Sequence, residues 1–450
     1  MFKSSRRQFL IGCSAAIASM SGSRIRFTAF ADPENSTDDH MLVVIFLRGG
    51  CDALNMVIPL GDEDRLYYEV KRPRLKIPEP VVSQLGNSEF GLHPSLYPLD
   101  GLYQDGHLSI IQAVGLKNVN TRSHFDAMAY MEQGTNSQET GTTGWLTRYL
   151  ESAGLSLNDS FEALSTGYIS PEMIHGYDRT LTIQNIDRFN IELGPWGYHD
   201  SNLSTLAALY NRSESAVHIA GQQAVSAINY VAEKFPDDNF SYTPANGATY
   251  PENEFGNQLK QVAQMIKLQL GLKVATVDLG GWDTHEDQAY SSDATDGYFA
   301  DLLRTLSQGL NAFYTDLDSG GVDNPVNKVA VVAMSEFGRR LRENENRGTD
   351  HGNGGLMFVM GGQVKGGLHG VWPGLHSDQL FEGADLAVNT DYRQVLSELM
   401  IRHMGNRNIK TIFPGYTNYE PLDMVEGEDL TPIIDIEDPQ DVYLPFMPEE

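Results

Sequence analysis

Histidine and acidic residues gather in four short polar segments of this 450-residue chain, at residues 48–55, 120–126, 278–285 and 335–355. Carboxylates and imidazoles together suit zinc or manganese, with calcium as the alternative where oxygen ligands dominate. A divalent ion bound by such residues activates water or a hydroxyl nucleophile. It also neutralises the charge that develops on a phosphoryl or sulfuryl group during transfer.

Two of the segments place histidine close to aspartate. Asp283 and His285 are two residues apart after a Gly-Gly turn. In extended backbone both side chains project to the same side and can hold one ion. Asp350 and His351 are adjacent in a glycine-rich loop, where each could be a ligand or one could hold the other in place. With Glu336, which follows an apolar run, these four residues are our candidate metal ligands in the second half of the chain.

The first two segments allow a structural interpretation as well as a chemical one. Asp52 is a candidate metal ligand, but an aspartate after a Gly-Gly turn also suits a turn or a helix N-cap. Ser123 could be a nucleophile, because free N–H groups and the helix dipole stabilise an anion at a helix start. With Asp126 it equally fits a capping box. Arg122 is a candidate oxyanion or phosphate clamp, and His124 a candidate acid–base group or metal ligand.

Five apolar runs predict the buried β-strands that would position these segments. They are short, rich in β-branched residues and followed by glycine or polar residues, and they cover residues 41–47, 108–114, 274–279, 329–334 and 356–360. Helical periods cover residues 204–234, 258–272, 298–317 and 392–404, and a further helix is expected to begin near Ser123 and end at Gly134. This alternation predicts a doubly wound α/β fold, with a mainly parallel sheet flanked by helices and ligands at the carboxyl ends of the strands.

The first 31 residues predict export. Ser5-Arg6-Arg7-Gln8-Phe9-Leu10 precedes a weakly apolar run, and a small-residue cleavage site ends at Ala31, as in a secretory signal. The paired arginines are typical of a twin-arginine signal, the alternative being an ordinary basic amphipathic N-terminus. Cys13 would offer lipidation in place of cleavage after Ala31. We expect a periplasmic or extracellular protein that uses the twin-arginine export machinery and has no transmembrane segment in its mature chain.

The rest of the chain is expected to form one large α/β domain over residues 32–418, with an insertion or cap over 158–251. An acidic tail follows over 419–450, with eleven acidic residues and no Lys or Arg, and predicts an extended, partly ordered strap without a site. The formal net charge of the chain is −28. A surface this negative repels nucleic acid, so we expect no nucleic-acid partner.

Several long motifs resemble the bacterial domain-of-unknown-function 1501 family. They are FLRGGCDALN, TRSHFDAMAYMEQG, GWLTRYL, DLGGWDTHEDQ, MSEFGRRLRENENRGTDHGNGG and TDYR, and the resemblance extends from about residue 41 to residue 415. That family is similar to the alkaline phosphatase-like superfamily, which includes sulfatases and cofactor-independent phosphoglycerate mutases. The resemblance implies metals at the strand ends. It matches Asp52 to the aspartate after the first strand, Ser123 to the nucleophile, and Asp283 and His285 to an Asp…His pair.

The last metal-binding motif of that superfamily can be aligned in two ways. Asp350-His351-Gly352-Asn353 resembles the mutase Asp-His-Gly-Asn signature. Ser335-Glu336-Phe337-Gly338 instead lies directly after a predicted strand, where that signature usually occurs, with Glu-Phe in place of Asp-His. On this second alignment His351 is the later histidine of the pattern. His369 is an additional candidate ligand.

The leading hypothesis is an exported metal-dependent hydrolase that acts on phosphate or sulfate esters of a small molecule or a polymer. Ser123 would attack the ester, and Arg122 with the helix N-terminus would hold the oxyanion. The residues expected to bind the divalent metal are Asp52, Asp283, His285, Glu336, Asp350 and His351. Two alternatives remain, namely a secreted or surface-associated binding protein without catalysis, and a metal-dependent esterase or lyase acting on acidic polysaccharide or lipid.

Overall fold

The computed structural model of the chain describes residues 39–136, 143–155, 162–177, 180–183, 199–212, 218, 221–222, 225, 241–321 and 323–434. The expected signal peptide and the end of the acidic tail lie outside the described residues, and the expected insertion over 158–251 is described only in part. All four polar segments are included. No helix among the described residues is long and apolar enough to cross a membrane.

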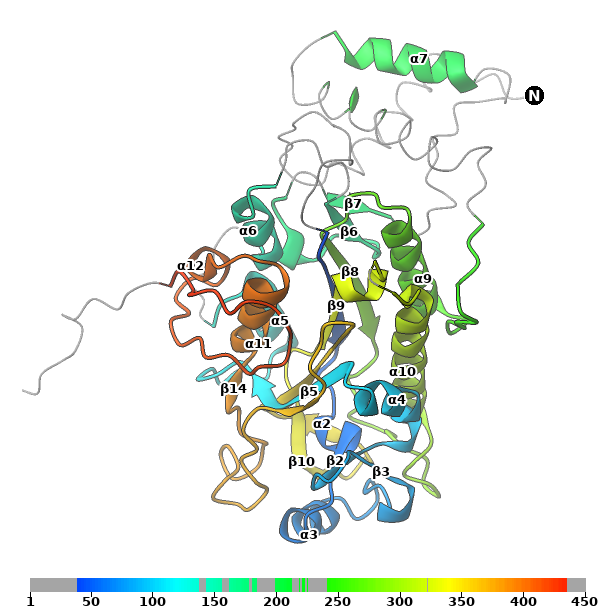
Figure 1. Cartoon of the computed structure of the whole chain (residues 1–450). Helices are drawn as coiled ribbons and strands as arrows, with labels where there is room; N and C mark the ends of the chain where they lie inside the picture. The colour runs from blue at the N-terminus through cyan, green and yellow to red at the C-terminus, as the bar shows by residue number, and fades with distance from the viewer. Residues whose placement is uncertain are drawn as a thin grey trace, which may run out of the picture.

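A nine-stranded sheet lies at the centre of the described structure (Figure 1). Its strands follow the order β13-β5-β12-β9-β1-β8-β6-β7, and β14 also pairs with β5. The bounds are β1 (Met41–Arg48), β5 (Leu108–Gly115), β6 (Ala163–Ser165), β7 (Thr180–Thr182), β8 (Val274–Gly280), β9 (Val329–Met334), β12 (Gly355–Gly361), β13 (Gly367–His369) and β14 (Thr390–Asp391). The five strands predicted from apolar runs are confirmed as β1, β5, β8, β9 and β12.

The sheet is mixed, because β12 runs antiparallel to both of its neighbours, β5 and β9. The expectation of a mainly parallel sheet is correct for the other pairs of strands. After β9 the chain forms a hairpin from β10 (Arg339–Glu343) and β11 (Thr349–His351), and then enters β12 directly. A parallel strand would need a crossover back to the opposite edge of the sheet. Without that crossover, β12 has to return in the reverse direction.

Three predicted helical periods are confirmed in position, and one of them in length as well. α10 (Tyr298–Leu317) has the predicted bounds, α9 (Glu254–Lys267) overlaps the period predicted over 258–272, and α11 (Tyr392–Glu398) begins at the predicted residue and continues as a π-helical turn over Leu399–His403. The predicted helix over 204–234 is represented by α7 (His199–Tyr210), beyond which few residues are described. The remaining α-helices among the described residues are α2 (Ala53–Met56), α3 (Asp62–Lys71), α4 (Asp100–Gln104), α5 (His124–Gln133), α6 (Trp145–Ser152) and α12 (Ile409–Ile412).

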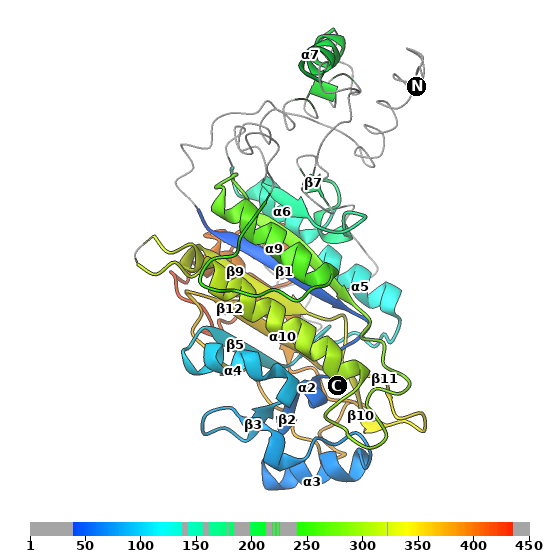
Figure 2. The ribbon, with the colours of Figure 1, turned by 90° about the vertical axis from the view of Figure 1, so that its right-hand side faces the viewer.

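Helices cover both faces of the sheet, so the central strands are apolar on both sides (Figures 1 and 2). Alternate residues of β1 show this directly. Val43, Ile45 and Leu47 belong to the core that includes α9 and α10. Leu42, Val44 and Phe46 belong to the core on the other face, with α5, α6, α11 and α12. A smaller sheet of β2 (Val57–Pro59), β4 (Phe90–Leu92) and β3 (Ser83–Gln84) lies beyond the central sheet, near α3.

The first part of the acidic tail is a strap that packs on the domain. Glu398, at the end of α11, is fully buried, and its carboxylate accepts hydrogen bonds from the backbone N–H groups of residues 422–425. Met424 and Val425 bury their side chains in the core on the α11 face. Four N–H donors thus take the place of water around the Glu398 carboxylate. Their hydrogen bonds attach the strap to the domain.

We predict that Glu398→Gln destabilises the protein by about 3 kcal/mol, because the amide turns one acceptor oxygen into a donor that faces other N–H donors. Urea unfolding followed by tryptophan fluorescence measures this change. The matched control is Glu420→Gln, an exposed position in the same tail, where we expect a change within about 0.5 kcal/mol. Equal unfolding midpoints for the two variants would contradict the proposed role of Glu398.

Candidate metal centre

α5 begins after β5 at the carboxyl edge of the sheet, and His124 is its first residue. Ser123 is the N-cap, and its Oγ accepts a hydrogen bond of 3.4 Å from the backbone N–H of Asp126. The hydroxyl considered as a nucleophile therefore has the capping role that was its alternative. This cap fixes the helix start, and so it sets the position of the His124 ring.

Two glycines allow three loops to meet at this edge of the sheet. A Cβ on Gly49, which follows β1, would lie 2.4 Å from the backbone nitrogen of Asp283, and the φ of +127° at Gly49 also favours glycine. A Cβ on Gly348, in the β10–β11 hairpin, would lie 2.2 Å from the backbone carbonyl carbon of His285. The loop after β8, which carries Asp283 and His285, is therefore enclosed between the loop after β1 and the hairpin that ends at His351.

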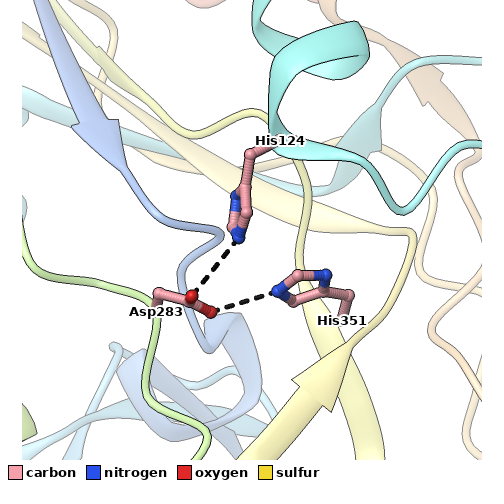
Figure 3. A group of neighbouring side chains, drawn as sticks. All are labelled: His124, Asp283 and His351. Atoms are coloured by element: carbon pink, nitrogen blue, oxygen red, sulfur yellow. Dashed lines mark hydrogen bonds and ion pairs between the residues drawn. The ribbon is translucent and has the colours of Figure 1, made fainter.

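His124, Asp283 and His351 form the group shown in Figure 3. Each offers one ligand atom, and these atoms lie within 4.8 Å of one another. His351 Nε2 is 3.1 Å from Asp283 Oδ1, and His124 Nε2 is 3.5 Å from Asp283 Oδ2. Ligand atoms of a tetrahedral zinc ion are about 3.3 Å apart. Both pairs thus have the spacing of ligands that share one ion.

A third imidazole adjoins this group. His285 Nε2 lies 3.1 Å from Asp283 Oδ1 and 2.9 Å from His351 Nε2. The structure therefore brings three histidines and one aspartate together from three separate segments of the chain. Half of the Asp283 side-chain surface is exposed, so the group is open to solvent on one side.

The protonation of the three rings follows from the partners of their Nδ1 atoms. Each of these partners is an oxygen that can only accept a hydrogen bond, so each Nδ1 must carry the proton. The pairs are His124 with Glu336 Oε1 at 2.7 Å, His285 with Asp350 Oδ1 at 3.1 Å, and His351 with the carbonyl of Arg122 at 2.8 Å. In the neutral form of each ring, Nε2 carries the free lone pair and is directed at Asp283.

This arrangement requires positive charge between the rings. The lone pairs of His285 Nε2 and His351 Nε2 face each other and the Asp283 carboxylate, which is repulsive unless a proton or a metal ion lies between them. His124 Nε2 is buried and has no hydrogen-bond partner among the described residues. Imidazole ligands of metal ions characteristically donate the other ring N–H to a carboxylate or a carbonyl. The residues present therefore fit a divalent transition metal such as zinc.

Nearby charges, hydrogen bonds and burial set the pKa values of the side chains in this group. Partial burial would raise the pKa of Asp283, but the hydrogen bond from Arg339 and the positive charge of its guanidinium lower it to about 2. The Arg339 guanidinium is fully buried, and its Nη2 is 2.6 Å from Asp283 Oδ1. Burial lowers the pKa of His351 and favours the neutral ring. The hydrogen bond to Glu336 raises the pKa of His124. The Asp283 carboxylate is thus ionised. Burial favours the neutral form of the His351 ring, whereas Glu336 favours a positive charge on the His124 ring.

Glu336 and Asp350, both expected as metal ligands, hold imidazole rings in place. Glu336 is fully buried, and besides His124 its carboxylate accepts hydrogen bonds from the Gly49 N–H and the Ser335 hydroxyl. Asp350 accepts from His285 Nδ1 and from the Asn344 side chain. The sequence allowed one residue of the adjacent pair at 350 and 351 to hold the other in place, but Asp350 contacts the ring of His285, and the ring of His351 contacts the Arg122 carbonyl instead.

Asp52 lies outside the group, which corrects its expected position among the ligands. It is fully buried, and Arg72 donates to both of its oxygens, at 2.6 and 2.8 Å. Gln288 donates a third hydrogen bond to this carboxylate, at 2.6 Å. Bidentate pairing with a guanidinium satisfies the carboxylate without a metal ion.

The guanidinium of Arg122 and the ring of His369 also have structural partners. Arg122 pairs with Glu382 and Asp385, at 2.9 and 2.7 Å, and its carbonyl rather than its guanidinium reaches the group. His369 contacts the carbonyls of Lys365 and Leu422, both at 3.2 Å. Neither side chain belongs to the candidate metal-binding group of His124, Asp283 and His351.

Arg339 was not identified from the sequence, although it directly contacts the group. Besides Asp283, its guanidinium donates to the carbonyls of residues 49, 50, 282 and 349 and so joins all three loops. The available signal was its place in Glu336-Phe337-Gly338-Arg339, where a basic residue stands within a predicted ligand segment.

A family model described as "Protein of unknown function (DUF1501)" matches residues 39–413. No curated protein matches the chain. The matched range contains every residue of the candidate metal centre, from Gly49 in the loop after β1 to His351 in the β10–β11 hairpin. The chain therefore belongs to the DUF1501 family.

Proposed function

We propose that this protein is an exported hydrolase of phosphate or sulfate esters that uses one divalent metal ion, zinc or manganese. The convergence of three histidine Nε2 atoms on Asp283 carries this proposal, because each ring has its Nδ1 proton committed to a fixed acceptor. His124, Asp283, His285 and His351 would hold the ion. A divalent ion bound there supplies Lewis-acid chemistry to an ester or to water.

The surrounding residues orient the ligands and set the charge of the site. Glu336 and Asp350 fix two of the imidazole rings, and Arg339 keeps Asp283 ionised. The buried Arg339 guanidinium also places a permanent positive charge beside the ligands. This charge favours the approach of an anionic ester group from the open side.

The ester class rests on similarity of pattern to the alkaline phosphatase-like superfamily. A mixed, mostly parallel sheet with a metal-binding group at its carboxyl edge supports that relation. The Ser5-to-Leu10 segment and the small residues that end at Ala31 support export by the twin-arginine pathway to the periplasm or beyond.

A second candidate function is that of a metal-containing binding protein without catalysis. Two observations favour it, since Ser123 caps α5 and the Asp52 carboxylate is paired with Arg72. Both residues match positions that would be chemically active in the superfamily pattern. Metal content alone does not separate the two functions, whereas turnover of an ester does.

We predict that the purified mature protein binds one zinc or manganese ion per chain, and that His351→Ala removes this ion, because the substitution deletes one of the converging nitrogens. Elemental analysis after desalting measures the stoichiometry. The matched control is His376→Ala, a partly exposed histidine outside the group, which should leave the metal content unchanged. A wild-type protein that binds no divalent ion would refute the proposal.

We also predict that Ser123→Ala keeps both the bound metal and the hydrolysis of aryl phosphate or aryl sulfate esters, with a stability loss of about 1 kcal/mol from the missing cap. Initial rates and urea unfolding of the same preparation measure the two effects. If Ser123→Ala abolishes turnover while the metal remains bound, Ser123 is the nucleophile, as the sequence pattern first suggested. If the wild-type protein binds metal but hydrolyses neither ester class, the binding-protein function is supported instead.

A further inference from the structure

The side chain of Gln288 forms a hydrogen bond with each of the two turns that carry residues of the candidate metal-binding group. Its side-chain oxygen accepts from the Thr284 hydroxyl and from the Thr349 hydroxyl, each at 3.0 Å. Thr284 stands between Asp283 and His285, and Thr349 is followed by residues 350 and 351. The Thr349 N–H also donates to the Thr284 carbonyl at 3.0 Å. One amide group thus sets the separation of two ligand-bearing turns.

The other end of this amide is anchored in a buried ion pair. Gln288 Nε2 donates to Asp52 Oδ2 at 2.6 Å, and Arg72 holds the same carboxylate through two hydrogen bonds. Arg72 also donates to the carbonyls of Leu341, at 2.8 Å, and Arg340, at 2.9 Å, which belong to β10. Asp52, Arg72 and Gln288 are all buried. The anchor therefore connects the loop after β1 to the hairpin that carries His351.

The chemistry of glutamine suits this position. Its amide nitrogen must face Asp52, because a carboxylate only accepts, and this leaves the two lone pairs of the amide oxygen for the two hydroxyls. A rotation of the amide by 180° would place its oxygen against the Asp52 carboxylate, with no donor between the two. The orientation of the side chain is therefore fixed, and a fixed side chain can hold both turns in register.

We infer that Gln288 is a positioning residue for the metal centre and acts through Thr284 and Thr349 on the spacing of the ligands. This inference rests on the proposed function, since it assumes that the group binds a metal ion. Neither Gln288 nor the two threonines offers a ligand to the metal-binding group. Their effect is expected on metal affinity and on the geometry of the bound ion.

The test compares Gln288→Met with Gln261→Met in the full mature protein, using Zn²⁺ as the probe and competition with a chromophoric chelator. Gln261 is a buried glutamine of α9 that donates to the Ile183 carbonyl, and so it controls for loss of a buried amide. We expect about a tenfold or larger loss of Zn²⁺ affinity in Gln288→Met, the range seen when partners behind metal ligands are removed. Gln261→Met should remain within about twofold of the wild type.

A second pair of variants applies if Gln288→Met does not fold. Thr349→Val removes one hydroxyl at constant volume, and Thr349→Ser retains it. We expect weaker Zn²⁺ binding and a shifted visible absorption band of the Co²⁺-substituted protein for Thr349→Val, and wild-type behaviour for Thr349→Ser. Where Gln288→Met does fold, its double variant with Thr349→Val should lose less affinity than the sum of the two single losses, because both substitutions remove the same contact.

Equal Zn²⁺ affinity and an unchanged Co²⁺ spectrum in Gln288→Met and Thr349→Val would overturn the inference, even if both variants unfold more readily. In that result the network only stabilises the fold, and the proposed function stands because the wild-type protein still binds metal. A wild-type protein that takes up neither Zn²⁺ nor Co²⁺ overturns the proposed function and, with it, this inference.

Discussion

The contact between Nε2 of His285 and Nε2 of His351, at 2.9 Å beside the Asp283 carboxylate, is the constraint on which the rest of the site depends. Two neutral imidazoles that both carry the proton on Nδ1 do not adopt it unaided, because their Nε2 lone pairs repel. The loops hold it through close backbone approach at Gly49 and Gly348 and through the Arg339 guanidinium, which joins all three loops. A proton or a metal ion between the two nitrogens would stabilise this contact.

The acidic residues around the site divide into three groups with different partners. Asp283 faces the imidazole nitrogens, whereas Glu336 and Asp350 hold rings from behind, and Asp52 is neutralised by Arg72. In a pattern with two metal ions, the aspartate after the first strand would hold an ion. Here a guanidinium provides the positive charge at that position. Because the Arg72 guanidinium already pairs with Asp52, this carboxylate is not available to hold a second metal ion.

The sequence predicted the central strands because their apolar, β-branched runs depend only on local composition, and it identified Asp283, His285 and His351 because their spacing carries a chemical pattern. It did not predict the reversed direction of β12, which follows from the absence of a crossover helix after the β10–β11 hairpin. It also could not assign Asp52, because Arg72 approaches it through a fold contact 20 residues away. Where a carboxylate has alternative partners, only the tertiary structure selects among them.

The strap that packs over Glu398 has a consequence for biosynthesis. Residues 422–425 supply the N–H groups that surround this carboxylate, and Met424 and Val425 complete the core on the α11 face. Until residues 422–425 dock, the Glu398 carboxylate lacks these four donors and the core on the α11 face lacks two of its side chains, so the domain reaches its final packing only after this segment has been synthesised. Docking of the strap is therefore a late step in the folding of the domain.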